Sequence, residues 1–126
     1  MIVLDAAALL AVLNKERGWD LVVREALDQD TTISAVNYAE VLQKASGLFS
    51  AERVDAVMGD LKITVSPFGR LDARLTSSLY RHRSGLSLAD RVCLALARSL
   101  TSPLCTADRA LGEWAIEFGV EFLPVR

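Results

Sequence analysis

Short apolar runs alternate along the chain with longer segments in which apolar residues recur at helical spacing. The first run, MIVLD at residues 1–5, predicts a strand, and residues 7–15 after it predict a helix. Further strands are predicted at residues 31–34, 62–68, 102–108 and 120–126, the last of them ended by Pro124. This alternation is typical of an α/β layer fold with a largely parallel central sheet.

Helical periodicity also covers the segments between these strands. It predicts helices at residues 19–28 and 35–49, from residue 50 to near 59, at about 71–81, in the segment 86–96, and at 109–119. Ser50 is a plausible N-cap of its helix. Because no linker, repeat or low-complexity segment interrupts the pattern, we expect one domain over residues 1–126.

Composition excludes several classes of protein. With 126 residues, 52% of them hydrophobic and 24% charged, the chain suits one compact core rather than a disordered protein. No apolar run is long enough to span a membrane and no basic segment precedes the first run, so we expect a cytoplasmic protein without a membrane partner. Cys93 and Cys105 are expected to be reduced and packed. A lone histidine, His82, removes any multi-histidine metal site, and the net charge of −2 gives no basic footprint for nucleic acid.

Two aspartates follow predicted strands. Asp5 ends the first strand and Asp108 comes just after the fourth. In an open parallel sheet ligands bind beyond the carboxyl ends of the strands, where both acids would lie. Each residue is also a favoured N-cap for the helix that follows, and for either aspartate alone the cap is the preferred interpretation.

Asp90 lies in the apolar segment LSLADRVCLAL at residues 86–96. Ser87 and Asp90 have the spacing of a capping box, which explains an acid in the first turn. A helical wheel places Cys93, Leu94, Ala97 and Leu100 on the side of Asp90, and Arg91 and Arg98 on another side. The carboxylate is therefore expected to point inward, toward the sheet, where it needs a partner.

Glu40 carries the weakest signal of the acidic residues. Its helix places Tyr38, Val41, Leu42 and Ala45 on one side, and Glu40 with Gln43 and Lys44 on the other. From the pattern alone, a surface ion pair between Glu40 and Lys44 at spacing i, i+4 is the preferred interpretation.

Acids gathered at one sheet edge would repel one another and raise each other's pKa. A divalent cation removes that repulsion, and carboxylate oxygens suit Mg²⁺ or Mn²⁺. Such an ion can activate a water against a phosphodiester. The acidic residues therefore point to metal-assisted phosphoryl chemistry.

Four segments carry a resemblance to a known family: MIVLDAAALLAVL, ISAVNYAEVLQK, GLSLADRVCLALA and LCTADRAL. In this order and spacing, the chain resembles PIN-domain proteins over essentially its whole length, specifically the ribonuclease toxins of VapBC-type toxin–antitoxin pairs. The resemblance implies a PIN-like α/β/α sandwich with a central, mostly parallel sheet flanked by helices. It also implies a metal-dependent endoribonuclease that hydrolyses RNA, a homodimer, and a cognate antitoxin that covers the acidic pocket.

The resemblance further implies roles for individual residues. Asp5 and Asp90 would be the principal ligands of Mg²⁺ or Mn²⁺, and Asp108 would complete the site directly or through water. Glu40 would hold or deprotonate the attacking water, and Thr106 matches the hydroxyl residue that supports the pocket. The helices around residues 36–61 are candidates for the antitoxin groove, with core packing as the alternative.

One position departs from the family pattern. Ala7 stands where relatives commonly have Ser, Thr or Asn, so one hydrogen bond into the acidic site is missing. Loss of such a contact can weaken metal affinity or activity by about 10–100-fold. Ser34 or Thr106 could substitute for it, and a PIN-like module that binds RNA or protein without cleaving is the alternative function. An aspartyl-phosphate enzyme fits poorly, because Ala7 replaces its second acid and no lysine follows Lys62.

Basic residues near the acids have two interpretations. Arg81, His82 and Arg83 precede the Asp90 helix and could contact an RNA backbone or simply lie near a helix end in solvent. Arg91 and Arg109 each follow a pocket acid, where we expect structural salt bridges first and phosphate contacts second. Trp19, Tyr38 and Trp114 are expected in the core or in an interface rather than as base-stacking platforms.

Overall fold

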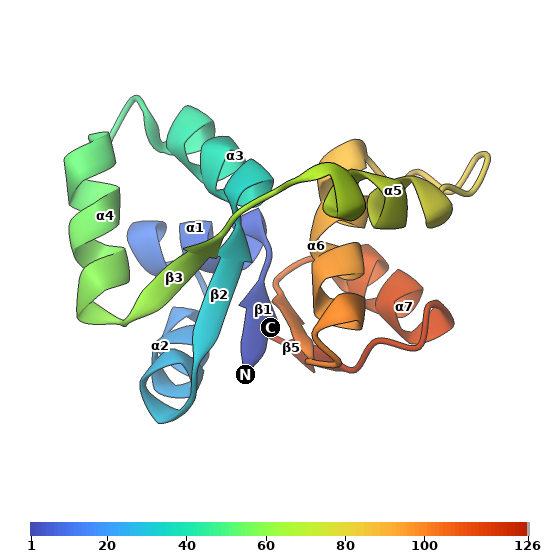
Figure 1. Ribbon diagram of the computed structural model, residues 1–126. Helices are drawn as coiled ribbons and strands as arrows, with labels where there is room; N and C mark the ends of the chain where they lie inside the picture. Colours follow the sequence, from blue (N-terminus) through green and yellow to red (C-terminus); the bar gives the residue numbers. More distant parts are fainter. Residues whose placement is uncertain (126) are drawn as a thin grey trace.

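A computed structural model describes residues 1–125 of the chain. Five strands form one parallel sheet in the order β3-β2-β1-β4-β5 (Figure 1). They are β1 (Ile2–Leu4), β2 (Thr31–Ser34), β3 (Ile63–Ser66), β4 (Leu104–Thr106) and β5 (Phe122–Pro124). The predicted α/β architecture is therefore confirmed, and within residues 1–125 the sheet is wholly parallel.

Seven helices within the same residues connect and cover the strands. They are α1 (Ala6–Asn14), α2 (Trp19–Asp28), α3 (Ala35–Ala45), α4 (Ala51–Asp60), α5 (Arg70–Ser78), α6 (Leu88–Ser99) and α7 (Arg109–Glu117). No helix among residues 1–125 has both the length and the apolar character needed to cross a membrane.

The two faces of β1 show how the layers form. Ile2 and Leu4 pack into a cluster with α1 to α4, whereas Val3 points to the other face and packs with α6 and α7. Because successive side chains of a strand alternate between faces, one short apolar run serves two separate cores. Figure 1 shows the resulting arrangement, with α1 and α2 on one side of the sheet and α6 and α7 on the other.

Several predicted elements end earlier in the structure than in the sequence pattern. The predicted helix at residues 35–49 ends at Ala45, where the backbone N–H groups of Leu48 and Phe49 both donate to the Ala45 carbonyl and turn the chain. The predicted helix at residues 71–81 starts at Arg70 and ends at Ser78. The strands are likewise shorter, and the final one ends at Pro124 as expected. Arg126, included in that predicted strand, lies outside the described residues.

The chain reverses its direction across the sheet between β1 and β4. From β1 it moves outward through β2 to β3, and then returns to place β4 on the other side of β1. The neighbours β1 and β4 are parallel, with Leu4 paired to Cys105. Their carboxyl ends therefore meet at a topological switch point, the position at which open α/β sheets form their ligand crevice.

Candidate acidic metal site

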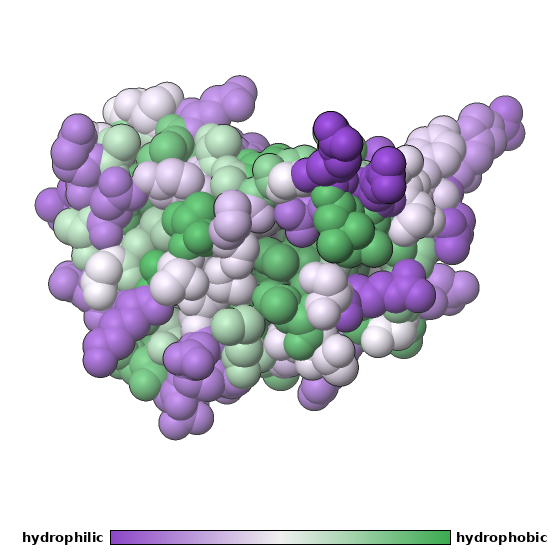
Figure 2. Space-filling view, viewed as in Figure 1, coloured by the Kyte–Doolittle hydropathy of each residue, from purple (hydrophilic) through white to green (hydrophobic). Residues whose placement is uncertain are grey.

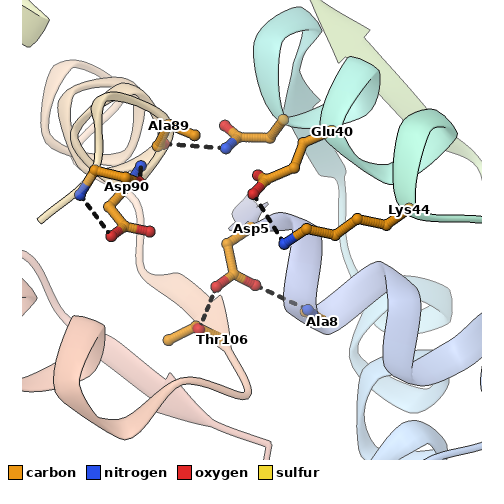
Figure 3. Close-up of polar contacts among 9 residues, drawn as sticks. Asp5, Ala8, Glu40, Lys44, Ala89, Asp90 and Thr106 are labelled. Atoms are coloured by element: carbon orange, nitrogen blue, oxygen red, sulfur yellow. Dashed lines mark hydrogen bonds and ion pairs between the residues drawn. The ribbon is translucent and has the colours of Figure 1, made fainter.

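Asp5 lies at this switch point, where it follows β1. Its Oδ1 accepts a hydrogen bond of 2.8 Å from the backbone N–H of Ala8 and so caps α1, as the sequence alone would suggest. Its Oδ2 accepts a hydrogen bond from the Thr106 hydroxyl at the end of β4 (Figure 3). Only 5% of the residue is exposed, so a helix cap and a buried carboxylate coincide in one side chain.

Burial raises the pKa of Asp5 to about 7. The hydrogen bonds from Thr106 and Ala8 lower this pKa, whereas the negative charges of Asp108 and Asp90 raise it. The remaining aspartates of the predicted site therefore act on Asp5 through space, although both are distant in sequence. This repulsion is what a bound cation would relieve.

Asp108 and Thr106 form a short relay beside Asp5. The backbone N–H of Asp108 donates to Thr106 Oγ1 at 2.9 Å, and the same hydroxyl donates to Asp5. Asp108 Oδ1 accepts from the backbone N–H of Leu111 at 3.3 Å and caps α7, while the residue as a whole is exposed. Thr106 is 1% exposed, so its hydroxyl can exchange hydrogen bonds only within this group.

Asp90 forms the capping box that its spacing from Ser87 predicts. Its Oδ2 accepts from the Ser87 backbone N–H, and its own N–H donates to Ser87 Oγ, each at 3.0 Å. The residue is half-buried, and the buried side of α6 includes Cys93, Leu94 and Ala97 as the wheel indicated. Leu100 departs from that prediction: it is 41% exposed because α6 ends at Ser99.

Glu40 pairs with Lys44, as the spacing of the two residues predicts. Lys44 Nζ lies 3.2 Å from Glu40 Oε2, and this is the one ion pair found within residues 1–125. The Glu40 side chain nevertheless keeps only 30% of its exposure, against 58% for Lys44. Figure 3 shows Glu40 on α3 facing the space that Asp5 and Asp90 border.

Cys93 is a buried thiol on α6 that is affected by three of these acids. Burial raises its pKa, and the charges of Asp5, Asp90 and Glu40 raise it further. Cys93 and Cys105 are both free and buried, as expected. Figure 3 shows Asp5, Glu40 and Asp90 around one space, but no three acidic, histidine or cysteine side chains in residues 1–125 lie close enough together to enclose a metal ion.

Asn37 on α3 is a residue that the sequence reasoning missed. It is 1% exposed, and its Nδ2 donates a hydrogen bond of 3.0 Å to the backbone carbonyl of Ala89, next to Asp90. Its Oδ1 is buried without a partner among the described residues. The available signal was its spacing: Asn37 lies four positions before Val41 and eight before Ala45, on the side of α3 that is buried, where an amide needs partners.

The arginines near the acids are arranged differently from the expectation. Arg91 forms no salt bridge with any residue in 1–125: its guanidinium lies over the Tyr80 ring at 5.3 Å, and its Nη1 donates to the Thr76 carbonyl at 3.5 Å. Arg109 is exposed and likewise forms no ion pair with residues 1–125. Salt bridging, the preferred role for both, was therefore the wrong interpretation, because the adjacent aspartates cap helices instead.

Arg81 and Arg83 lie in the segment that joins α5 to α6. The Arg81 guanidinium lies over the Phe118 ring at 5.0 Å, so this arginine fastens the segment to α7. Arg83 is exposed, with φ +58°. Tyr38 donates to Asp55 through its hydroxyl, Trp114 stacks on Phe118 at 5.7 Å, and both residues are partly buried.

The residues around the pocket fit a hard divalent cation in their chemistry. Asp5 offers a buried carboxylate whose charge is disfavoured by its surroundings, and Asn37 Oδ1 is a buried acceptor without a partner. Ala7 offers no hydrogen-bonding side chain to this site, whereas the Thr106 hydroxyl donates to Asp5. The Ser34 hydroxyl accepts from the Val36 N–H and caps α3, and no hydrogen bond joins it to Asp5 among residues 1–125.

Comparison with solved structures places this fold among known ones. VapBC2 from Rickettsia felis, bound to a DNA fragment from its promoter, matches with a TM-score of 0.72 and 15% identity over 98% of both chains. A toxin–antitoxin complex from Klebsiella pneumoniae matches with a TM-score of 0.67 and 20% identity, over 86% of this chain and 87% of the other. FitAcB from Neisseria gonorrhoeae gives a TM-score of 0.66 and 19% identity, over 99% and 98%.

Comparison of the sequence alone gives a family match. No curated protein sequence matches the chain. The family model of the PIN domain, in contrast, matches residues 2–116, which include every acidic residue of the predicted site. The structural matches share the fold at low identity, and the family match spans most of the sequence. The chain therefore belongs to the PIN domain family.

Proposed function

We propose that the protein is a metal-dependent endoribonuclease and the toxin of a VapBC-type toxin–antitoxin pair. The observation that carries this proposal is the Asp5 carboxylate, 5% exposed at the switch point and under the charges of Asp90 and Asp108. A carboxylate in that position is costly for the folded protein unless it binds something positive. Binding of Mg²⁺ or Mn²⁺ for phosphoryl chemistry would supply that positive charge.

Each acidic residue has a separate task in this proposal. Asp5, Asp90 and Asp108 would hold the cation, which supplies charge neutralisation and a more acidic bound water. Glu40 orients the attacking water and accepts its proton, and Thr106 fixes the rotamer of Asp5 through its hydrogen bond. As the water oxygen bonds to phosphorus, the ester bond on the opposite side breaks, the leaving ribose oxygen takes a proton from solvent, and Glu40 releases its proton to solvent.

An antitoxin partner and a homodimer belong to the same proposal. Two of the similar structures are described as VapBC2 and as a toxin–antitoxin complex, which supports an antitoxin for this chain. The region at residues 36–61 that we propose as its groove exposes Leu48 to 81% between α3 and α4. We place the protein in the cytoplasm, where its RNA substrate would be found.

The test is cleavage of RNA with Mn²⁺ or Mg²⁺ by the wild type, Asp5→Asn and Asp90→Asn. Both substitutions keep an oxygen that can cap the helix, so the fold is retained while one negative charge is lost. Asp60→Asn, at the exposed end of α4, is the matched control. We expect cleavage by the wild type and the control, and loss of cleavage in both site variants.

Two outcomes would contradict the proposed mechanism. Equal cleavage by all four proteins, or cleavage that persists in excess chelator, would show that the acids do not hold a catalytic metal. Failure of the folded wild type to cut any of many RNAs would favour the second candidate, a PIN-domain module that binds without cleaving. Ala7 and the spread of the acids around the pocket are the observations that keep this candidate in view.

A further inference from the structure

Positive charge is concentrated in one segment of the chain. Residues 70–109 contain seven arginines and three aspartates, a formal net charge of +4, although the whole chain has a net charge of −2. Half of the 14 basic residues therefore lie in this segment. The segment contains α5, the connection to α6, α6 itself and β4, and it ends at Asp108 and Arg109.

The three aspartates of the segment do not neutralise its arginines. Asp72 Oδ2 accepts from the Gly69 N–H at the start of α5. Asp90 accepts in the same way from the Ser87 N–H at the start of α6, and Asp108, itself the N-cap of α7, accepts from the Leu111 N–H. Each carboxylate is thus committed to a helix N-terminus, and no arginine of the segment forms an ion pair within residues 1–125.

Two of the seven arginines are held by aromatic rings, and the others face solvent. Arg81 lies over Phe118 and Arg91 over Tyr80, as described above. Arg70 and Arg74 are exposed one turn apart on α5, and Arg83 is exposed in the connection that follows. None of these three guanidinium groups has a polar partner in the described part of the chain.

The position of α5 relates these charges to the acidic pocket. Figure 1 shows α5 at the end of the sheet toward which the strands point, beside the start of α6 that carries Asp90. In the same view, Figure 2 shows strongly hydrophilic side chains over α5 and along the connection projecting beyond it. Exposed arginines without ion pairs among residues 1–125 therefore lie on α5 and in the connection that leads from it to the helix of Asp90.

We propose that Arg70, Arg74 and Arg83 form a phosphate-binding rim that holds the backbone of a single-stranded RNA beside the acidic pocket. This inference rests on the proposed nuclease function for its ligand class. Unpaired arginines that share a surface repel one another, and a polyanion turns that repulsion into binding energy. Contacts of this kind hold the backbone and carry no sequence information, so the rim serves many RNA sequences equally.

The test is binding of a fluorescein-labelled 20-nucleotide single-stranded RNA, followed by fluorescence anisotropy in excess chelator so that no cleavage occurs. The rim variant is Arg70→Gln/Arg74→Gln/Arg83→Gln. Its matched control is Arg17→Gln/Arg24→Gln/Arg53→Gln, which removes three exposed arginines outside the segment and changes the net charge equally. Affinity is measured at several salt concentrations, because each phosphate contact adds about 0.7 to the slope of log affinity against log salt for a single strand.

We expect the rim variant to bind at least about tenfold more weakly, with a slope shallower by roughly 2, and the control to match the wild type. Equal effects of the two triple variants would overturn the inference, because net charge alone would then explain them. An unchanged rim variant, or no binding by the wild type, would also overturn it. If the wild type binds RNA through the rim but never cleaves it, the phosphate-binding rim is supported and only the proposed nuclease activity is contradicted.

Discussion

The side-chain amide of Asn37 donates to the backbone carbonyl of Ala89 across 3.0 Å, and so ties the helix of Glu40 to the helix of Asp90. The two residues are separated by 52 positions in the sequence. Asn37 is buried in α3 and Ala89 lies in the first turn of α6. This hydrogen bond therefore sets the distance between two acids of the proposed site without involving either carboxylate.

Asn37→Leu should lower the free energy of unfolding by about 1–3 kcal/mol, because the Ala89 carbonyl loses its donor in a buried position. Urea denaturation measures this loss. The matched control is Gln43→Leu, an exposed amide on the same helix, which we expect to change stability by less than about 0.5 kcal/mol. Isothermal titration with Mn²⁺ should also show weaker binding by Asn37→Leu at temperatures where it is fully folded; unchanged Mn²⁺ affinity would argue against positioning of Asp90.

Asp5 should make the stability of the metal-free protein depend on pH. Its pKa is about 7 in the folded protein and near 3.8 in the unfolded chain, so the folded state binds the proton more tightly. Its contribution to stability is therefore fully present below about pH 4 and is lost as the pH rises through 7. The difference between the two pKa values corresponds to at most roughly 4 kcal/mol of the free energy of unfolding.

Asp5→Asn removes this titration, and the comparison isolates it. In chelator, the variant should be more stable than the wild type at pH 8, and its advantage should shrink toward pH 4. Denaturation with urea at several pH values gives both curves, with Asp60→Asn as a control that should run parallel to the wild type. Parallel curves for Asp5→Asn as well would show that burial does not raise the pKa of Asp5.

Thr106→Val should raise the pKa of Asp5 above its value in the wild type. Valine has the shape of threonine but cannot donate to Asp5, and this hydrogen bond is what lowers the pKa most. The variant also leaves the Asp108 N–H without its acceptor, so we expect a stability loss of about 1–3 kcal/mol. A carbon-13 NMR titration of the Asp5 carboxyl measures the pKa directly.

Thr106→Ser is the matched control for this prediction. Serine keeps the hydroxyl and loses only a methyl group, so the pKa of Asp5 should stay near that of the wild type. If serine and valine move the pKa equally, the effect comes from packing at the end of β4, and the hydrogen bond has no special part in it.

The layered fold and the positions of two acids could be predicted because both depend on local pattern. Ile2, Val3 and Leu4 form an apolar run that suits a strand buried on both faces, and Asp5 must then emerge at its carboxyl end. That Asp5 and Asp108 meet depends on β4 lying next to β1. Helical periodicity does not encode the order of strands, so this adjacency came from the carboxyl-end rule and from the family resemblance.

Contacts between distant segments were the part that sequence could not supply. The Arg81–Phe118 contact joins the α5–α6 connection to α7, and it depends on how two loops pack. The same holds for Arg91, for which a neighbouring aspartate suggested an ion pair. Asp90 instead accepts a hydrogen bond from the Ser87 N–H. The first turn of a helix has free N–H groups next to this side chain, so the bond does not require a long, flexible side chain to be ordered. Local capping prevailed over pairing between adjacent charges.

Gly18→Ala should be strongly destabilising, because this glycine connects the start of α2 with the end of the sheet. Gly18 has φ +93°, and a Cβ built there would lie 1.9 Å from the backbone oxygen of Val125. Both the backbone conformation and the space exclude a side chain, so either the Val125 segment or the 15–18 turn must move. We expect a loss of more than about 2 kcal/mol, measured by thermal or urea denaturation. Gly47→Ala is the matched control: its Cβ would meet no atom within 4 Å, and we expect a change within about 1 kcal/mol of the wild type. A similar small change for both variants would mean that the contact between Gly18 and Val125 does not hold these two segments together.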